Sequence, residues 1–479
     1  MAGFDAPRPP QWRPADCDPE PFDNDTRRER LERLWAYHTG RPPLPQVSAE
    51  YTEVFRAVMR KARSNYAGMC VAALLNRMSL TSVATGKDST GDDDLFTQIA
   101  EVSNWEAMIQ DLFTYLFTMS ETYAMVVPPK PGTGGVPMIS ALDPRRCIGD
   151  INPDNPQVLR SAMVRSFDPT YGTEHAVLFV PGRAYHGVRD AYGAFGESIS
   201  AKWDWDTTRG GADGEPVEGI DAFGGIPIVR IDNAEGMGEF EPHIDLLDRI
   251  NDTTLQRIVI AWYQAFKQRA IIGDLEGDTD DAEPMTLEEF RDIFTADPGS
   301  LWKVPDGVKF WESDPVDLTS IITAKRDDVK EFAAVTFTPL HLITPDAANQ
   351  SAEGASLVRE GINHKVGDRR SRVTPKLKMV LRMAFAMAGD AERGNTIKLN
   401  WGPLENNSLA DKGSATAQAK GVLSLRTILI DIWGMTPTEA EDNITQLSAE
   451  QLLAVTTALA GQNSQPAQQQ TGQPAGAAA

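Results

Sequence analysis

The stretch 239-EFEPHIDLLDRINDTTLQRIVIAWYQAFKQR-269 decides how this chain is organised. It predicts one long helix, because Pro242 is tolerated in a first turn, acids gather at the start and bases gather at the end. A helix of this length spans about 46 Å at 1.5 Å per residue. Its second half is apolar on more than one face and therefore needs cover on several sides. The apolar residues concerned are Leu255, Ile258, Val259, Ile260, Trp262, Tyr263 and Phe266.

A second long helix is predicted over residues 315–336, with Asp314 as its cap, and it would span about 33 Å. The segment between the two helices predicts a small module with a strand at 270–272 and a short helix that opens on the capping box Thr286-Leu-Glu-Glu289. Runs 301–304 and 308–311 flank a Pro-Asp-Gly turn and predict a β-hairpin. The two long helices, 239–269 and 315–336, would thus form a stalk, and the module between them would form its tip. One chain cannot bury the apolar faces of its own stalk, whereas copies packed side by side can.

The N-terminal half predicts an α+β region. Helical periodicity covers residues 27–37, 50–78 and 105–119, and Asp25 or Thr26 can cap the first of these helices. After Thr122 the pattern changes to short β-rich runs separated by Pro and Gly. These runs are 123–127, 163–167, 176–180, 200–205 and 226–231.

Residues 338–350 predict a loop with two prolines, and a long helix follows over residues 351–387. Pro375 lies inside this helix and predicts a kink or a break. From Arg359 to Arg382 the helix carries eight bases and two acids, so it is a basic island in an acidic chain. Two interpretations stand: pairing with acids of a neighbouring subunit, or transient contact with DNA phosphates. They apply to Lys365, Arg369, Arg370, Arg372 and Lys376.

The C-terminal part predicts a strand at 396–401 and three or four helices over 409–460. Capping boxes begin at Thr436 and at Ser448. Residues 461–479 are rich in Gln, Pro, Gly and Ala and predict a disordered tail. We expect residues 1–26, rich in Pro and Asp, to form a disordered arm.

Composition narrows the class of protein. The 479 residues exceed one typical core and predict several domains, and the net charge of −22 argues against a protein that grips DNA phosphates. The negative net charge is compatible with a channel wall past which DNA slides, and it is equally compatible with a role in keeping the protein soluble. No apolar run is long enough for a membrane span, and no signal peptide is expected. Three distant cysteines, Cys17, Cys70 and Cys147, fit a reducing cytoplasm.

Motifs of enzyme chemistry are missing from the sequence. It contains no G-x-x-x-x-G-K-[ST], H-E-x-x-H or G-x-S-x-G, so we expect neither catalytic residues nor cofactors. One acidic run alternates like the start of an EF-hand loop, but Thr279 and Met285 replace the required Gly and Glu. A solvated acidic loop is the simpler interpretation. Its acids are Asp274, Glu276, Asp278, Asp280, Asp281 and Glu283.

The order of elements resembles the portal proteins of tailed bacteriophages, specifically the siphophage-type family common in actinobacterial phages. The resemblance covers residues from about 27 to 460 and rests on distributed motifs. Ala352 stands where the family often has Gly. The motifs are RSNY (63–66), ALDP (141–144), IPIV (226–229), GEFEP (238–242), IDLLDRIN (244–251) and NQSAEGA (349–355).

This resemblance implies an α+β, mostly helical portal fold with wing, stem, clip and crown regions, assembled as a ring. The implied regions are a wing (27–238), stem helices (239–269 and 315–337), a clip (270–314), a tunnel loop (338–350), a long kinked helix (351–389), a wing strand and linker (390–408) and a helical crown (409–460). The clip would dock partners through the six acids of the acidic run. The tunnel loop would face DNA through Thr338, Leu340, His341, Leu342, Ile343, Thr344, Asp346, Asn349 and Gln350.

The resemblance also implies partners and a location. Twelve copies would form a ring at one capsid vertex, and double-stranded DNA would pass through it without sequence specificity. The terminase large subunit, which is the ATPase, and a head-completion or adaptor protein would dock on the clip. Major capsid and scaffolding proteins would surround the ring, which would assemble in the host cytoplasm and remain in the virion. The rival interpretations are another structural virion protein, such as a minor capsid or adaptor protein, and a hydrolase using scattered carboxylates.

Overall fold

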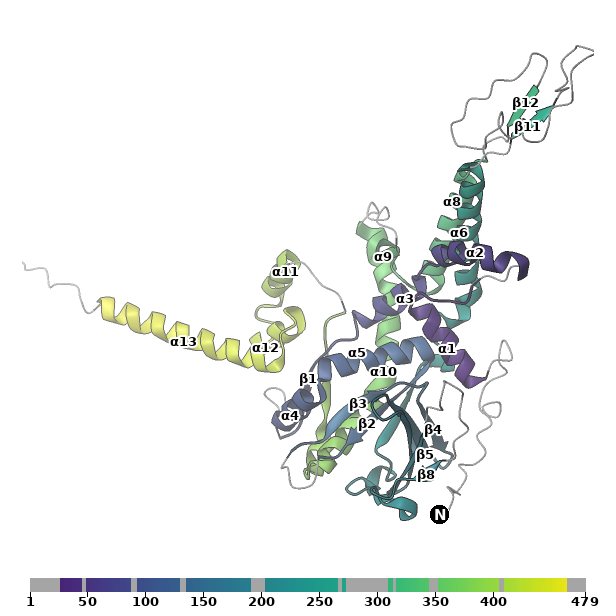
Figure 1. Cartoon of the computed structure of the whole chain (residues 1–479). Helices are drawn as coiled ribbons and strands as arrows, with labels where there is room; N and C mark the ends of the chain where they lie inside the picture. The colour runs from purple at the N-terminus through teal and green to yellow at the C-terminus, as the bar shows by residue number, and fades with distance from the viewer. Residues whose placement is uncertain are drawn as a thin grey trace, which may run out of the picture.

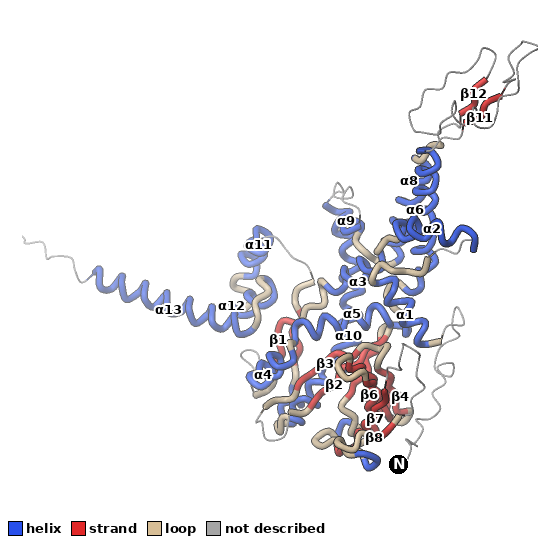
Figure 2. Tube along the Cα trace, in the orientation of Figure 1, coloured by secondary structure: helices blue, strands red, loops and turns tan. Residues whose placement is uncertain are grey.

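The protein has a mixed α/β body from which a pair of helices and a separate C-terminal helical arm project (Figure 1). The secondary-structure map in Figure 2 shows most strands gathered in the body, helices forming both projections, and one pair of strands, β11 (Arg269–Ile272) and β12 (Lys309–Glu312), at the far end of the paired helices. The computed structural model describes residues 26–44, 49–87, 93–129, 135–190, 203–265, 269–272, 309–312, 316–343, 352–404 and 409–462.

The helices of the body begin at clear local signals. Thr26 and Glu29 form a capping box at the start of α1 (Arg27–His38), and the Asp93 carboxylate accepts hydrogen bonds from the first amides of α4 (Asp94–Ser103). The predicted helix over 50–78 is wrong in one respect. It is two helices, α2 (Ala49–Ala62) and α3 (Tyr66–Leu75), because Asn65 caps a new helix by accepting a hydrogen bond from Gly68 N. The predicted helix at 105–119 is confirmed as α5 (Trp105–Met119).

Antiparallel pairing organises the strands of the body into three sheets. A two-stranded sheet joins β1 (Leu80–Ala84) to β13 (Lys398–Trp401), so chain segments more than 300 residues apart are neighbours. A second sheet has the order β10-β2-β3, from Ile228–Asp232, Glu121–Val127 and Met138–Leu142. The third has the order β4-β5-β6-β7-β8, with β9 also paired to β7. Its strands are Cys147–Asn152, Asn155–Asp168, Thr173–Val180, Arg183–Asp190, Asp204–Trp205 and Glu215–Pro216.

One apolar core ties the body to the projecting helices. Leu34 of α1, Phe113 of α5 and Phe385 of α10 (Ala352–Met387) are fully buried in it together. The same core contains Ile250 of α6 (Ile244–Ala265) and Phe332 of α8 (Thr319–Val335). A smaller core lies between the second and third sheets. The stalk helices are therefore rooted in the body.

The predicted stalk is present with different bounds. The first helix begins at Ile244, after a 3-10 turn at Glu241–His243, and ends at Ala265, so Glu239 lies outside the helix and Arg269 lies in β11 (Arg269–Ile272). The second helix begins at Thr319. The strand at 270–272 is confirmed, and β12 (Lys309–Glu312) pairs with it in antiparallel register. The run 301–304, which the predicted hairpin pairs with 308–311, lies outside the described residues. The short helix predicted after Thr286 also lies outside them.

The third long helix, α10, runs through Pro375 without a break in its secondary structure. The predicted loop that precedes it begins as a short helix, α9 (Leu340–Ile343), rather than as irregular chain. Because α9 packs on both α3 and α8, its place is fixed by the body and by the stalk.

The C-terminal arm is helical, as predicted. It contains α11 (Leu409–Ala419), α12 (Leu425–Thr427), a π-helical turn at Ile428–Ile432 and α13 (Pro437–Gln462). The capping box at Thr436 is confirmed by reciprocal hydrogen bonds with Glu439. The one predicted at Ser448 is wrong, because Ser448 lies inside α13 and its hydroxyl donates to Thr445 O.

Candidate functional site at the base of the paired helices

The paired helices α6 and α8 are buried at their base and exposed toward their tip. Leu247 and Ile250 of α6 and Phe332 of α8 are at most 3 % exposed. Farther along, Trp262 is 55 % exposed and Val316, just before α8, is 53 % exposed. In the described part of the chain, the outer half of the stalk therefore exposes more than half of the surface of these two large apolar side chains.

Polar contacts hold the two helices of the stalk side by side. Arg249 of α6 lies 3.0 Å from the Asp328 carboxylate of α8 and also pairs with Glu331. Nearer the tip, Gln264 Nε2 donates to Val316 O at 2.8 Å. The half-exposed Arg249 pair is worth little in free energy, so it sets alignment more than stability.

A buried carboxylate anchors the chain segment that leads into α6. The Glu239 side chain is 2 % exposed, and its carboxylate lies 2.8 Å from Lys365 Nζ and 2.6 Å from Arg369 Nε, both on α10. Asn233 Nδ2 donates to the same carboxylate at 3.1 Å. Burial acts to raise the pKa of the Glu239 carboxyl, but the Arg369 hydrogen bond and the Lys365 charge outweigh it and hold the pKa below its usual range. The carboxylate is therefore ionised, and it joins α6 to α10.

The same lysine also holds the end of α8. Lys365 Nζ donates to Thr336 O at 3.0 Å, while the Thr336 and Thr338 hydroxyls lie 2.8 Å apart. Both threonines are buried beside Cys70 of α3, and burial raises the pKa of that thiol. Residues of α3, α8 and α10 and the approach to α6 thus meet at one polar centre inside the apolar core.

The turn from α8 to α9 contains a strained residue. Phe337 has φ of +56°, a left-handed conformation that is unfavourable for a residue with a bulky side chain. Its ring lies against Gly361 of α10, where an added Cβ would be 2.9 Å from Phe337 Cδ1. Phe337 remains 55 % exposed, so packing alone does not explain its conformation. The buried threonines on either side hold the turn in place.

The residues proposed to face DNA differ in how exposed their side chains are. Thr338 is buried, while His341 and Leu342 of α9 are exposed and Ile343 packs partly against the core. Leu340 opens α9. Thr344, Asp346, Asn349 and Gln350 lie outside the described residues. The six acids proposed for the clip, Asp274, Glu276, Asp278, Asp280, Asp281 and Glu283, also lie outside them.

The bases of α10 find partners within their own chain. Lys365 and Arg369 bind Glu239, as described above, and Arg372 pairs with Asp368 one turn away at 2.8 Å. Arg370 donates to Gly402 O and Arg77 O and lies over the Trp401 ring, and Lys376 donates to Gln157 O. Most bases of this island therefore contact groups of their own subunit.

Sequence reasoning missed the polar centre at the stalk base. Glu239 was assigned to a helix N-terminus on charge pattern alone, and nothing local marks Asn233, Cys70, Phe337 or Gly361. Lys365 and Arg369 follow Glu239 by 126 and 130 residues, and no local sequence pattern relates residues that far apart. Among the described residues, no group of three or more His, Cys, Asp or Glu side chains could hold a metal ion. No helix in that part of the chain is long and apolar enough to cross a membrane.

Comparison with known proteins identifies the family. Residues 22–451 match the family model described as phage portal protein, SPP1 Gp6-like. The chain therefore belongs to the SPP1 Gp6-like family of phage portal proteins, and its function is that of a portal protein. The helix-rich α+β fold, with a stalk projecting from the body, is the fold of a portal protein.

Solved structures with a similar arrangement come from gene transfer agent particles. A chain from the neck of a native particle, computed with C12 symmetry, is 13 % identical and has a TM-score of 0.41, over 83 % of this chain and 97 % of that one. A chain from the virion of the native particle is 14 % identical, with the same TM-score and coverage. No curated protein matches the sequence.

Proposed function

We propose that copies of this chain form a ring, with twelve subunits as the expected number, at one vertex of a phage capsid. The observation that carries this proposal is the exposure of the large apolar side chains of Trp262 and Val316 on the outer half of the stalk. A helix that is apolar on several faces needs partners, and α8 covers only part of α6. Identical stalks set side by side around an axis would cover the remainder and leave a central channel.

The channel is the path we propose for double-stranded DNA during packaging and ejection. The net charge of −22 suits a wall along which DNA slides, because phosphate binding would slow its passage. α9 and the loop of residues 338–350 would lie nearest the DNA. Since Lys365, Arg369, Arg370 and Lys376 bind groups of their own chain, we assign them to contacts within the subunit. The exposed Arg372 pairs with Asp368 of the same helix.

Partners would dock at the tip of the stalk. We propose that the region 270–314 binds the terminase large subunit during packaging and a head-completion or adaptor protein afterwards. Major capsid and scaffolding proteins would contact the outside of the ring. We further propose that the chain itself catalyses no reaction, that it assembles in the host cytoplasm, and that it stays in the virion.

Electron microscopy of the purified full-length chain tests the ring. We expect annular particles with a central hole and a stalk on one side. Monomers alone at micromolar concentration, over several salt conditions, would contradict the proposal. The tip assignment is tested separately by reversing Asp278, Asp280 and Asp281 to Lys, which should weaken terminase docking and leave ring assembly intact. A matched variant carries Asp154→Lys, Glu218→Lys and Glu392→Lys, three exposed acids of the body, and should dock normally.

A further inference from the structure

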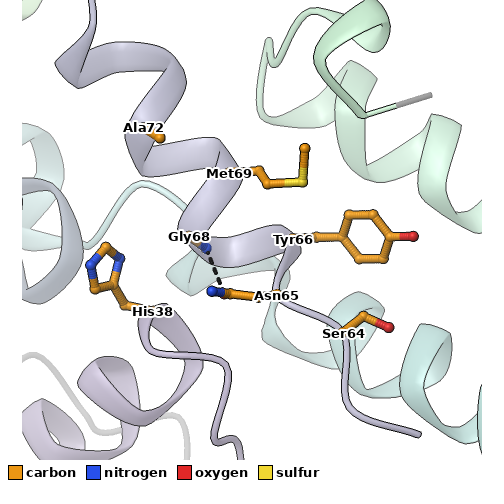
Figure 3. Close-up of a pocket in the computed structure, with 7 residues that line it drawn as sticks. All are labelled: His38, Ser64, Asn65, Tyr66, Gly68, Met69 and Ala72. Atoms are coloured by element: carbon orange, nitrogen blue, oxygen red, sulfur yellow. Dashed lines mark hydrogen bonds between the residues drawn. The ribbon is translucent and has the colours of Figure 1, made fainter. Parts of the chain in front are cut away.

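A hollow of about 590 Å³ opens on the surface where α1 ends and α3 begins. Figure 3 shows His38 on one side of it and Tyr66 and Met69 on the other, with the Asn65 side chain turned back to cap α3. Among the described residues, His38 Nδ1 is buried without a hydrogen-bond partner. We call this feature the α1–α3 hollow. Polar residues such as Ser64 and Asn65 and apolar residues such as Met69 and Ala72 both line it, and it is open to solvent.

Three arginines lie close to one another beside the α1–α3 hollow. Arg63 directly precedes the lining residues Ser64 and Asn65, and its pKa is lowered by burial and by the nearby charges of Arg60 and Arg41. Arg63 Nε is buried and has no hydrogen-bond partner in the described part of the chain. Within the described ranges, none of these three arginines forms an ion pair, although acids outnumber bases in the chain by 68 to 46. A cluster of like charges without counter-charges is unfavourable unless a partner supplies acids.

The complementary feature lies where α4 meets α5. Val102 is 55 % exposed there, and Glu101 and Glu106 beside it are exposed. Both glutamates line a smaller hollow of about 350 Å³, and neither has a basic partner in the described part of the chain. We call this the α4–α5 corner. It carries exposed acids beside an exposed apolar side chain, whereas the α1–α3 hollow lies beside bases.

We propose that the α4–α5 corner of one subunit docks in the α1–α3 hollow of the next subunit. In Figure 1, α4 and the start of α5 lie away from the end of α1 and the start of α3. A head-to-tail ring requires two different flanks that fit each other, and these flanks are opposite in charge. The inference rests on the proposed ring and specifies which surfaces close it. The occupant of the hollow is therefore a second copy of this chain.

Charge swapping in the full-length chain tests this docking. The variant Arg60→Glu/Arg63→Glu, and separately the variant Glu101→Lys/Glu106→Lys, should sediment as subunits where the wild type forms rings. Mixing the two variants should restore rings, because every interface in an alternating ring then pairs opposite charges. The fourfold variant should assemble alone for the same reason. Arg28→Glu/Arg146→Glu, which reverses two exposed bases elsewhere, should assemble like the wild type.

The outcomes separate the inference from the proposed function. If the wild type forms no rings, the proposed function fails. If the wild type forms rings and either folded double variant does so equally well, the docking surfaces are wrong while the ring stands. Lack of rescue on mixing two variants whose thermal unfolding matches the wild type also overturns the pairing. A labelled DNA duplex distinguishes a further outcome. If wild-type rings bind the duplex and the rings of the Arg60→Glu/Arg63→Glu variant do not, the hollow is a DNA-binding site instead.

Discussion

The ammonium group of Lys365 lies 2.8 Å from the carboxylate of Glu239, an ion pair that joins α10 to the segment leading into α6. The Glu239 side chain is 2 % exposed and that of Lys365 is 13 % exposed, so the pair is shielded from solvent. Because Lys365 also binds the last turn of α8, a single side chain connects both helices of the stalk to the body. The stalk's orientation therefore depends on this centre.

Replacing Glu239 with Gln should destabilise the chain strongly. The substitution keeps the shape but leaves the buried Lys365 without a counter-charge and Arg369 with only the half-exposed Asp368. Breaking a comparable buried pair costs about 3–5 kcal/mol. The free energy of unfolding, measured by urea denaturation, checks this. Glu331→Gln is the control, because Glu331 is 56 % exposed and its pairing with Arg249 should contribute less than about 1 kcal/mol. Equal effects of the two substitutions would refute a special role for Glu239.

The contribution of Glu239 should depend on pH in a defined direction. Its pKa is lower in the folded chain than the value of about 4.3 expected in the unfolded chain. The ion pair therefore stabilises the fold fully above that unfolded value, and the stabilisation disappears as the pH falls through the folded-state pKa. The difference in unfolding free energy between wild type and Glu239→Gln should be constant near neutral pH and shrink below about pH 4. A difference that grows on acidification would have the wrong sign.

Gly361 should tolerate alanine only when Phe337 is absent. In the wild type the added Cβ would lie 2.9 Å from Phe337 Cδ1, and crowding of this kind costs about 1–3 kcal/mol. In a Phe337→Asn background, where Asn accepts the left-handed turn, the same substitution should stabilise by up to about 1 kcal/mol, because Ala favours helix over Gly. Urea denaturation of the four chains checks the change of sign.

A second glycine of α10 supplies the matched control for that cycle. Nothing lies within 4 Å of a Cβ added at Gly367. Gly367→Ala should therefore stabilise both backgrounds equally, by about 1 kcal/mol or less. If Gly361→Ala behaves like Gly367→Ala in the wild type, Phe337 does not occupy the space above Gly361.

Replacing Trp262 with Glu should prevent ring formation without unfolding the subunit. Trp262 is 55 % exposed on the outer half of α6, so its replacement should lower the unfolding free energy of the subunit by only about 1 kcal/mol. In a ring, the new charge would be buried between stalks. Sedimentation velocity and electron microscopy should show subunits in place of rings. Gln256→Glu adds the same charge at an exposed polar position of α6 and should assemble normally.

Local chemistry in the sequence was enough to predict most individual elements. The capping box at Thr436, the apolar periodicity of α5 and the two stalk helices are visible without a structure, because each depends on residues within one or two helical turns. The sequence left the cap of α1 open between Asp25 and Thr26, and the structure shows that it is Thr26. The break before α3 was missed because Asn65 can either continue a helix or cap a new one. The portal family was recognisable for the same reason, since its motifs are short and keep their order along the chain.

Only the tertiary structure decided how these elements meet. It paired Glu239 with bases 126 and 130 residues away, set Phe337 against Gly361, placed β12 beside β11 and gave most bases of α10 partners in their own chain. The physical reason is that charge and hydrogen-bonding partners are chosen by proximity in three dimensions, which sequence spacing does not encode. Periodicity shows that a helix has a face to bury, and only packing shows which neighbour buries it.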